Sequence, residues 1–260
     1  MATVPAATLA AFGAAEEPVP LGGGSGSTFR AGDLVLKAVD DAAESAWTQD
    51  LLARIEPDGF KLPQPVATEA GAMVHDGWIA STFVGGLRPL APDWSAVVTA
   101  GLRFGDAAEG VRDGGEETLD RRTHRWAVAD RVAWGEADLS LGDEAQDLRL
   151  EILADLGPPA PVRRLVHGDL SGNVFVGPDG VAVILDVSPY LRPHRWAEAI
   201  VIMDAVLWHG AGRDLVQAFT HDQAGDLLRR ALLFRLAAEA FAPAHRVDID
   251  RYRRVMSTLD

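Results

Sequence analysis

The fold is decided by the stretch Arg164-Leu165-Val166-His167-Gly168-Asp169-Leu170-Ser171-Gly172-Asn173-Val174-Phe175-Val176 and by Val183-Ile184-Leu185-Asp186, which follows it. Short aliphatic runs surround a tight polar segment, a pattern that predicts strand, loop, strand, turn and strand. The loop holds the carboxylate of Asp169 and the amide of Asn173, and the third strand ends on the carboxylate of Asp186. These three oxygen-bearing side chains are the first candidates for a functional site.

Phosphoryl transfer from a nucleotide requires this set of groups. One carboxylate must lie beside the acceptor hydroxyl, and an amide oxygen with a second carboxylate must hold Mg²⁺. The stretch therefore indicates kinase chemistry.

The composition fits a soluble globular protein, with 48% hydrophobic and 24% charged residues in a chain of 260. The net charge of −14 argues against nucleic acid or a membrane as the main partner, because both require clustered cations. No cysteine is present, which excludes disulfides and thiolate metal sites. No apolar run approaches the roughly 20 residues that span a bilayer. The first positive charge is Arg30, so the start lacks the cationic region of a signal peptide, and we expect a cytoplasmic location.

The first part of the chain is predicted to be rich in strands. Two strands joined by a glycine-rich turn are expected over 19–30 and another over 34–39, followed by a helix from Asp40 or Asp41 to about Ile55 and a hairpin over 72–84. Gly85-Gly86 is the expected boundary between an N-terminal lobe, 1–84, and a C-terminal lobe, 85–260. Helices are predicted near 3–12, 94–104, 119–134, 143–156, 196–209, 215–219, 226–241 and 248–259. The predicted fold class is α+β, with a small β-rich lobe and a larger helical lobe.

This order of features resembles the aminoglycoside phosphotransferase family, relatives of the protein kinases that phosphorylate small molecules. The resemblance covers a glycine-rich hairpin, the strand lysine Lys37, a helix glutamate, the His167-Gly168-Asp169 loop and the metal carboxylate Asp186. It implies a two-lobed protein-kinase-like fold. Lys37 stands out because only it and Lys61 are lysines among the 24 basic residues.

The resemblance also implies roles for the polar side chains. Asp169 would accept or orient the proton of the attacking hydroxyl, an effect typically worth about 10²–10⁴-fold in rate. Asn173 and Asp186 would hold Mg²⁺ through hard oxygen atoms. Lys37 would bind the α- and β-phosphates and pair with a helix acid, for which Glu44 is chosen over its rival Asp41.

Further roles follow from the same resemblance. Backbone N–H groups of the glycine-rich turn would lie over the phosphates, although such a run by itself is typical of a flexible turn. Its members are Gly23, Gly24, Ser25, Gly26 and Ser27. The segment from Thr82 to Val84 would contact adenine through its backbone. His167 would hold the loop in shape, and Glu198 would support that loop from a neighbouring helix.

Two departures from the family pattern matter. Three residues separate Asp169 from Asn173, where kinases have four. The loop must therefore close more tightly, or metal binding must depend mainly on Asp186. Asp186 is followed by Val187-Ser188-Pro189 and not by Phe-Gly, which argues against an activation segment.

The predicted function is Mg²⁺-dependent transfer of the γ-phosphate of ATP or GTP to a hydroxyl of a small molecule. The candidate acceptors are an aminoglycoside, an amino sugar or another sugar-containing compound, antibiotics included. The alternative hypothesis is a nucleotide-binding pseudokinase that acts as a scaffold or sensor, which the shortened loop favours and the retained polar residues oppose.

Overall fold

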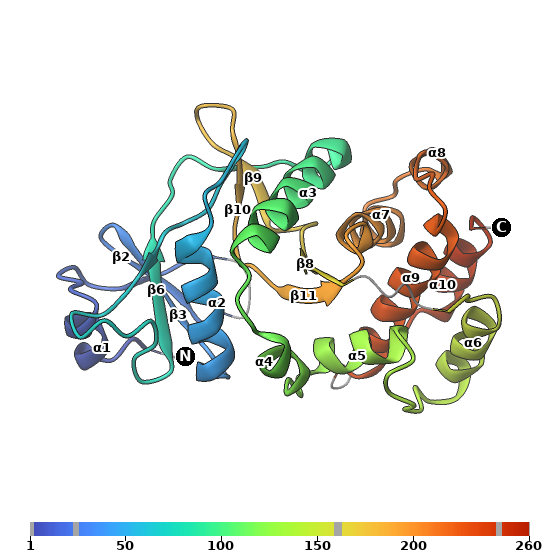
Figure 1. Cartoon of the computed structure of the whole chain (residues 1–260), viewed down its shortest axis with the longest axis horizontal. Helices are drawn as coiled ribbons and strands as arrows, with labels where there is room; N and C mark the ends of the chain where they lie inside the picture. Colours follow the sequence, from blue (N-terminus) through green and yellow to red (C-terminus); the bar gives the residue numbers. More distant parts are fainter. Residues whose placement is uncertain (1–2, 23–25, 159–162, 243–245, 260) are drawn as a thin grey trace.

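The chain divides into a β-rich N-terminal part and a helical C-terminal part, which lie at opposite ends of the long axis (Figure 1). The computed structural model describes residues 3–22, 26–158, 163–242 and 246–259. Strands β8 to β11 lie between the two ends, where the predicted strand–loop–strand unit is found.

The N-terminal sheet has the strand order β1-β2-β3-β6-β5, and all its pairings are antiparallel. Its strands are β1 (Val19–Pro20), β2 (Thr28–Ala31), β3 (Leu34–Ala38), β5 (Pro65–Val66) and β6 (Trp78–Thr82), and the short helix α1 (Ala6–Ala11) precedes them. Phe29, Leu36 and Trp78 are buried in a small core of this part. The predicted hairpin differs in its first strand, because residues 68–72 form a turn closed by the Thr68 N–H and the Ala72 carbonyl, and β5 pairs with β6 instead.

Helix α2 (Ala42–Arg54) connects the two parts. The Asp41 carboxylate accepts hydrogen bonds from the N–H groups of Ala43 and Glu44 at 2.9 and 3.0 Å, so Asp41 is the N-cap. Leu51 and Leu52 pack into the large core of the C-terminal part and not into the small core of the sheet. Strand β4 (Phe60–Lys61), which follows, runs parallel to β10 (Ala182–Ile184). The segment around α2 thus holds the N-terminal sheet beside the central strands.

The central strands form two small sheets. One has the order β4-β10-β9-β7, with β7 at Arg88–Pro89 and β9 at Val174–Val176. The other pairs β8 (Arg164–His167) with β11 (Pro189–Arg192) in antiparallel register.

The helices of the C-terminal part surround one large core. They are α3 (Trp94–Val111), α4 (Glu116–Asp120), α5 (Arg125–Ala133), α6 (Asp143–Ala154), α7 (Trp196–Trp208), α8 (Arg213–Ala218), α9 (Ala224–Ala240) and α10 (Ile249–Met256). Helix α7 is buried on nearly every side, as its apolar sequence requires. Nowhere in the described chain does a helix have the length and apolarity needed to cross a membrane.

One predicted helix, 119–134, is two helices in the structure. The chain breaks after α4 because Arg122 turns inward and donates to the backbone carbonyls of Leu119 and Pro189. His124 then caps α5 by accepting a hydrogen bond from the Ala127 N–H at 3.2 Å. The other predicted helices are confirmed, with ends that shift by a few residues and a longer α3.

A buried ion pair fixes β11 against the helices. The Arg192 guanidinium at the end of β11 bonds both carboxylate oxygens of Asp130 on α5, with Nε at 3.1 Å from each. It also contacts Glu136 at 2.7 and 2.8 Å. Because a planar guanidinium bonds carboxylates only in defined directions, these contacts set the position of β11 relative to α5.

Phe104 on α3 is a central packing residue. Its ring lies edge-on to Phe60 of β4 at 6.2 Å and to His167 of β8 at 5.8 Å. We expect Phe104→Ala, at a side chain with 0% exposure, to lower the free energy of unfolding by about 3–5 kcal/mol. Chemical denaturation measures this, with Leu150→Ala at a 53% exposed position of α6 as control, expected within about 0.5 kcal/mol of wild type. Equal effects of the two changes would contradict the packing described here.

His167 makes stability depend on pH. Burial is the main cause that lowers the pKa of His167 from 6.5 to about 4, so the folded protein holds it neutral. Between these values the unfolded chain binds a proton that the folded chain does not. The contribution of His167 to the free energy of unfolding is therefore fully present above about pH 6.5 and is lost as the pH falls toward 4. This loss lowers the free energy of unfolding by up to about 3 kcal/mol.

We expect His167→Asn to remove this share of the pH dependence, because asparagine keeps a hydrogen-bond acceptor and does not titrate. The free energy of unfolding of both proteins, measured from pH 7 to pH 4, gives the two slopes. Identical slopes would show that His167 is not held neutral.

Candidate active site

The loop of residues 168–173 is seated on the segment that follows Asp186. The Gly168 N–H donates to the Ser188 carbonyl at 2.8 Å, in continuation of the β8–β11 pairing. A Cβ atom on Gly168 would overlap the ring of Tyr190, so only glycine allows this approach. Within the loop, the Asp169 N–H donates to Nδ1 of His167 at 3.0 Å. His167 thus contacts the loop that the sequence expects it to support.

Asp169 and Asn173 come together in spite of the shorter loop. The Asn173 N–H donates to the Leu170 carbonyl at 3.0 Å, which closes a tight turn. Nδ2 of Asn173 then donates to the Asp169 backbone carbonyl at 2.8 Å and to Oδ2 of Asp169 at 3.2 Å. The Asp169 side chain is 52% exposed, so a solute can reach its carboxylate.

Asp186 lies at the same end of the β9–β10 hairpin as Asn173. Ile184 pairs with Val174, and the next residue, Leu185, donates its N–H to the Asn173 carbonyl at 2.8 Å. Asp186 has a left-handed backbone with φ of 47°, which is uncommon outside glycine and which Asp tolerates better than most residues. Its carboxylate forms an ion pair with Nζ of Lys37 on β3, which joins the N-terminal sheet to the central strands.

The partner of Glu44 differs from the predicted one. The predicted pair was Lys37 with Glu44, but the Glu44 carboxylate lies 3.3 Å from the Arg122 guanidinium, while Lys37 pairs with Asp186. Burial raises the pKa of Glu44, and Arg122 opposes that rise. The pairing follows from the inward turn of Arg122 between α4 and α5, which no local pattern around Glu44 indicates. Asp41, the rival candidate, is the helix cap.

The support of the loop also comes from a different residue than predicted. Glu198 forms an ion pair with Arg195, one turn away on its own helix. The contact to the loop is made by Asp204, farther along α7, whose Oδ2 accepts a hydrogen bond from the Ser171 hydroxyl at 2.7 Å. The sequence carries a signal for this, because Asp204 is a charge inside the apolar run Ile200–Leu207 and must find a partner when buried.

Arg235 on α9 is a second residue that the sequence analysis missed. Its guanidinium bonds Asp204 at 2.7 and 2.6 Å and reaches Oδ1 of Asp169 at 3.3 Å. It too lies in an apolar run, from Leu232 to Ala237. A guanidinium therefore faces the carboxylate predicted to be catalytic.

The predicted nucleotide-binding residues are placed in part. Gly23, Gly24 and Ser25 lie outside the described residues, and Gly26 follows them with φ of 73°. Ser27 accepts a backbone hydrogen bond from Ala38 at 3.1 Å, and its neighbour Thr28 pairs with Lys37 in the β2–β3 register. The end of the glycine-rich turn is therefore next to the strand lysine.

The segment from Thr82 to Val84, predicted to contact adenine, has part of its backbone hydrogen-bonded within the N-terminal part. The Thr82 N–H already donates to the Gln64 carbonyl at 2.9 Å, so this donor is engaged within the sheet. Phe83 likewise donates to the Asp33 carbonyl at 2.7 Å. Val84 lies beyond these pairings, so its backbone is the better candidate for a base contact.

Asn173 and Asp186 fit a magnesium site of the kind completed by a substrate. Nδ2 of Asn173 bonds Asp169, and the other amide atom is a hard oxygen, as are the carboxylate oxygens of Asp186. Among the described residues no group of three or more His, Cys, Asp or Glu side chains could hold a metal. Mg²⁺ commonly takes one or two protein ligands, with water and substrate phosphates filling the rest.

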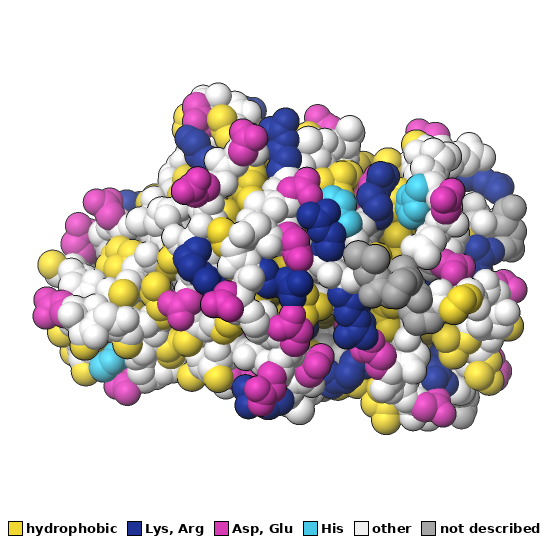
Figure 2. Space-filling model, in the orientation of Figure 1, with side chains coloured by type: hydrophobic (Ala, Val, Ile, Leu, Met, Phe, Trp, Pro, Cys, Tyr) yellow, Lys and Arg dark blue, Asp and Glu magenta, His cyan; other side chains and the backbone are white. Residues whose placement is uncertain are grey.

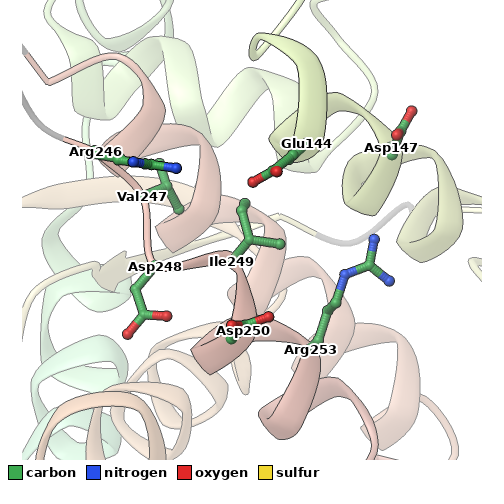
Figure 3. A pocket seen from close by; sticks show the side chains of 8 residues that line it. All are labelled: Glu144, Asp147, Arg246, Val247, Asp248, Ile249, Asp250 and Arg253. Atoms are coloured by element: carbon green, nitrogen blue, oxygen red, sulfur yellow. The ribbon is translucent and has the colours of Figure 1, made fainter.

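The site is separate from one hollow of the surface in the C-terminal part. That hollow, of about 570 Å³, lies between α6 and the segment before α10 (Figure 3) and is lined by the charged residues Glu144, Asp147, Arg246, Asp248, Asp250 and Arg253 with Val247 and Ile249. None of the predicted site residues lines it. Elsewhere, the face in Figure 2 shows Lys and Arg side chains interleaved with Asp and Glu.

Known structures share the fold of this chain. An aminoglycoside phosphotransferase from Alicyclobacillus acidocaldarius is similar over 100% of this chain and 94% of its own, with a TM-score of 0.59 and 16% identity. A choline/ethanolamine kinase family protein from Mesorhizobium loti is similar over 95% and 90%, with a TM-score of 0.57 and 15% identity. A spectinomycin phosphotransferase in complex with ADP and spectinomycin is similar over 94% and 89%, with a TM-score of 0.53 and 13% identity.

At these identities the likeness establishes the fold, and it confirms the predicted two-lobed protein-kinase-like architecture. No curated protein matches the sequence significantly. The family model of the phosphotransferase enzyme family matches residues 18–233, most of the chain, so this protein belongs to the phosphotransferase enzyme family.

Proposed function

We propose that this phosphotransferase moves the γ-phosphate of ATP or GTP to a hydroxyl of a small molecule, with Mg²⁺ as cofactor. The observation that carries the proposal is the meeting of two pairs: Asp169 with Asn173 in one loop, and Asp186 with Lys37 across two sheets. Leu185, bonded to Asn173, brings the two pairs to the same end of one hairpin. The ADP complex of the spectinomycin phosphotransferase supports a nucleotide as phosphate donor.

In this mechanism the protein acts by positioning and by charge. Asp169, accessible and acceptor-only when ionised, accepts or orients the proton of the attacking hydroxyl. The Lys37 ammonium exchanges its contact with Asp186 for the α- and β-phosphates when nucleotide binds. Backbone N–H groups at the glycine-rich turn, ending at Gly26 and Ser27, lie over the phosphates.

Mg²⁺, held by the Asn173 amide oxygen and the Asp186 carboxylate, would neutralise charge on the β- and γ-phosphates. The chain's own contribution is the left-handed backbone at Asp186 and the contact of its carboxylate with Lys37 of the N-terminal sheet. Catalysis of this kind needs no covalent intermediate on the protein.

The acceptor is proposed to be an amino sugar or another sugar-containing compound, aminoglycosides included. Relatives of this fold are described as acting on aminoglycosides, spectinomycin and choline or ethanolamine, all small molecules that carry a hydroxyl. The net charge of −14 favours a basic acceptor through long-range attraction.

The geometry of the loop removes the main argument for the alternative hypothesis, a pseudokinase that acts as a scaffold or sensor. The one-residue deletion was the feature that favoured a pseudokinase. The tight turn closed by Asn173 and Leu170 absorbs the deletion, and Nδ2 of Asn173 still bonds Asp169. The polar groups thus keep an arrangement suited to transfer.

Asp169→Asn is expected to lower kcat by about 10²–10⁴-fold, because an amide cannot take up the proton of the hydroxyl. Nucleotide affinity should stay within about twofold of wild type, since Asp169 is not assigned to nucleotide binding. The rate is measured by mass spectrometry as the mass shift of hydroxyl compounds of a panel when the enzyme transfers phosphate to them. Calorimetric titration with ADP gives the nucleotide affinity. Asp147→Asn, at an exposed position of α6, is the control. A fully active Asp169→Asn protein would refute the assignment.

Asp186→Ala is expected to raise the Mg²⁺ concentration that gives half-maximal activity by about tenfold or more, because a ligand carboxylate is removed. Asp179→Ala is the matched control, since Asp179 lies at the opposite end of the same hairpin and pairs with Lys61. Magnesium titrations of initial rates compare the three proteins. If both variants shift alike, the ion is not held by Asp186.

A further inference from the structure

Arg235 is a charged residue buried in the middle of the C-terminal core. Its side chain is 4% exposed, and its nearest anion, Asp204, is also 4% exposed. Nε and one terminal nitrogen of Arg235 bond the two carboxylate oxygens of Asp204 at 2.7 and 2.6 Å. Burial opposes the charge, but Asp204 raises the pKa of Arg235, so the guanidinium stays protonated. The pair joins α7 to α9.

The same nitrogen makes a second contact. The Nη2 atom of Arg235 that bonds Asp204 also lies 3.3 Å from Oδ1 of Asp169. Asp204 in turn accepts a hydrogen bond from the Ser171 hydroxyl, two residues farther along the loop. The loop is therefore held against α7 and α9 at two side chains, Asp169 and Ser171.

Aromatic rings enclose the guanidinium. Its Cζ atom lies 4.9 Å from the ring centroid of Phe234, 5.4 Å from that of Trp126 and 5.8 Å from that of Trp208. These rings pack around the guanidinium, which is 4% exposed, while the Asp169 carboxylate that it reaches stays half exposed.

Asp169 needs such a contact because its side chain is half exposed. An exposed carboxylate samples several rotamers, and a displacement of about 1 Å at a reacting group can lower a rate by about 10²-fold. Arg235 holds Oδ1, while Nδ2 of Asn173 contacts Oδ2 from within the loop. Two donors on different elements thus fix the plane of one carboxylate.

We propose that Arg235, fixed by Asp204, is a positioning residue that sets the orientation of the Asp169 carboxylate for the acceptor hydroxyl. This rests on the proposed function, in which Asp169 is the catalytic residue. Arg235 acts through Asp169 and does not itself bind nucleotide or metal.

The test compares Arg235→Lys with Arg230→Lys. Both arginines are buried on α9, but Arg230 bonds the backbone carbonyls of Ala133 and Gly157, away from the loop. Lysine keeps the charge as a single point and cannot bond Asp204 and Asp169 in the same way. We expect Arg235→Lys to lower kcat by about 10- to 100-fold per folded molecule, with the KM for nucleotide within about twofold. Arg230→Lys should leave kcat within about twofold of wild type.

Hydrogen–deuterium exchange gives a readout that needs no acceptor. Amides of residues 168–174 should exchange faster in Arg235→Lys than in wild type or Arg230→Lys. If Arg235→Lys does not fold, Ser171→Ala replaces it, because that change removes only the hydrogen bond from the loop to Asp204 and should also speed this exchange.

The outcomes separate the two proposals. The positioning role is overturned if folded Arg235→Lys has the kcat of wild type, or if its loop amides exchange as slowly as those of Arg230→Lys. Where Arg235→Lys cannot be studied, unchanged loop exchange in Ser171→Ala overturns it. If the wild-type protein transfers phosphate to no compound of the panel but the variant still shows faster loop exchange, the proposed function fails while the contact to the loop stands.

Discussion

The arrangement of the site depends on the close seating of the loop after β8 on strand β11. The backbone of Gly168 lies against the ring of Tyr190 and donates to Ser188, an approach that any side chain at position 168 would prevent. Because β8 and β11 are in fixed antiparallel register, this seating determines where Asp169 leaves the strand. The direction of Asp169 toward α9, and the return of the chain at Asn173 into the β9–β10 hairpin, both follow from it.

Buried arginines position the elements around that loop. Arg192 joins β11 to α5 through Asp130, and Arg235 joins α9 to α7 through Asp204. Burying such charges costs desolvation energy that their attraction only partly offsets, so these pairs do not by themselves explain stability. What they supply is direction, because a guanidinium donates hydrogen bonds to carboxylates only in its own plane. The loop lies between the elements that the two pairs align.

The nucleotide end of the site is built across two sheets. Lys37 on β3 and Asp186 after β10 meet although they belong to different sheets, and α2 with β4 holds these sheets together. Glu44 is engaged by Arg122, which also bonds the carbonyl of Pro189 beside the loop. The helix that follows the strand lysine is thereby connected to the segment after Asp186, so that both ends of the site share one framework.

The sequence by itself determined the parts that are close along the chain. Asp169, Asn173 and Asp186 could be predicted to lie close together because one loop and one hairpin place them, and hairpin geometry follows from local alternation and turn residues. A start of α2 at Asp40 or Asp41 was predicted on the same local basis, and the structure shows Asp41 as the cap. The two-lobed order of strands and helices was also predicted, since it depends on the periodicity of each segment.

Only the tertiary structure decided the partners of the buried charges. Glu44 meets Arg122 across 78 positions, and Arg235 meets Asp204 across 31 and Asp169 across 66. A buried charge must find a counter-charge, so the sequence shows that Asp204 and Arg235 need partners. It does not show which ones, because the choice is made by how α5, α7 and α9 pack around the loop, and packing depends on the whole core at once.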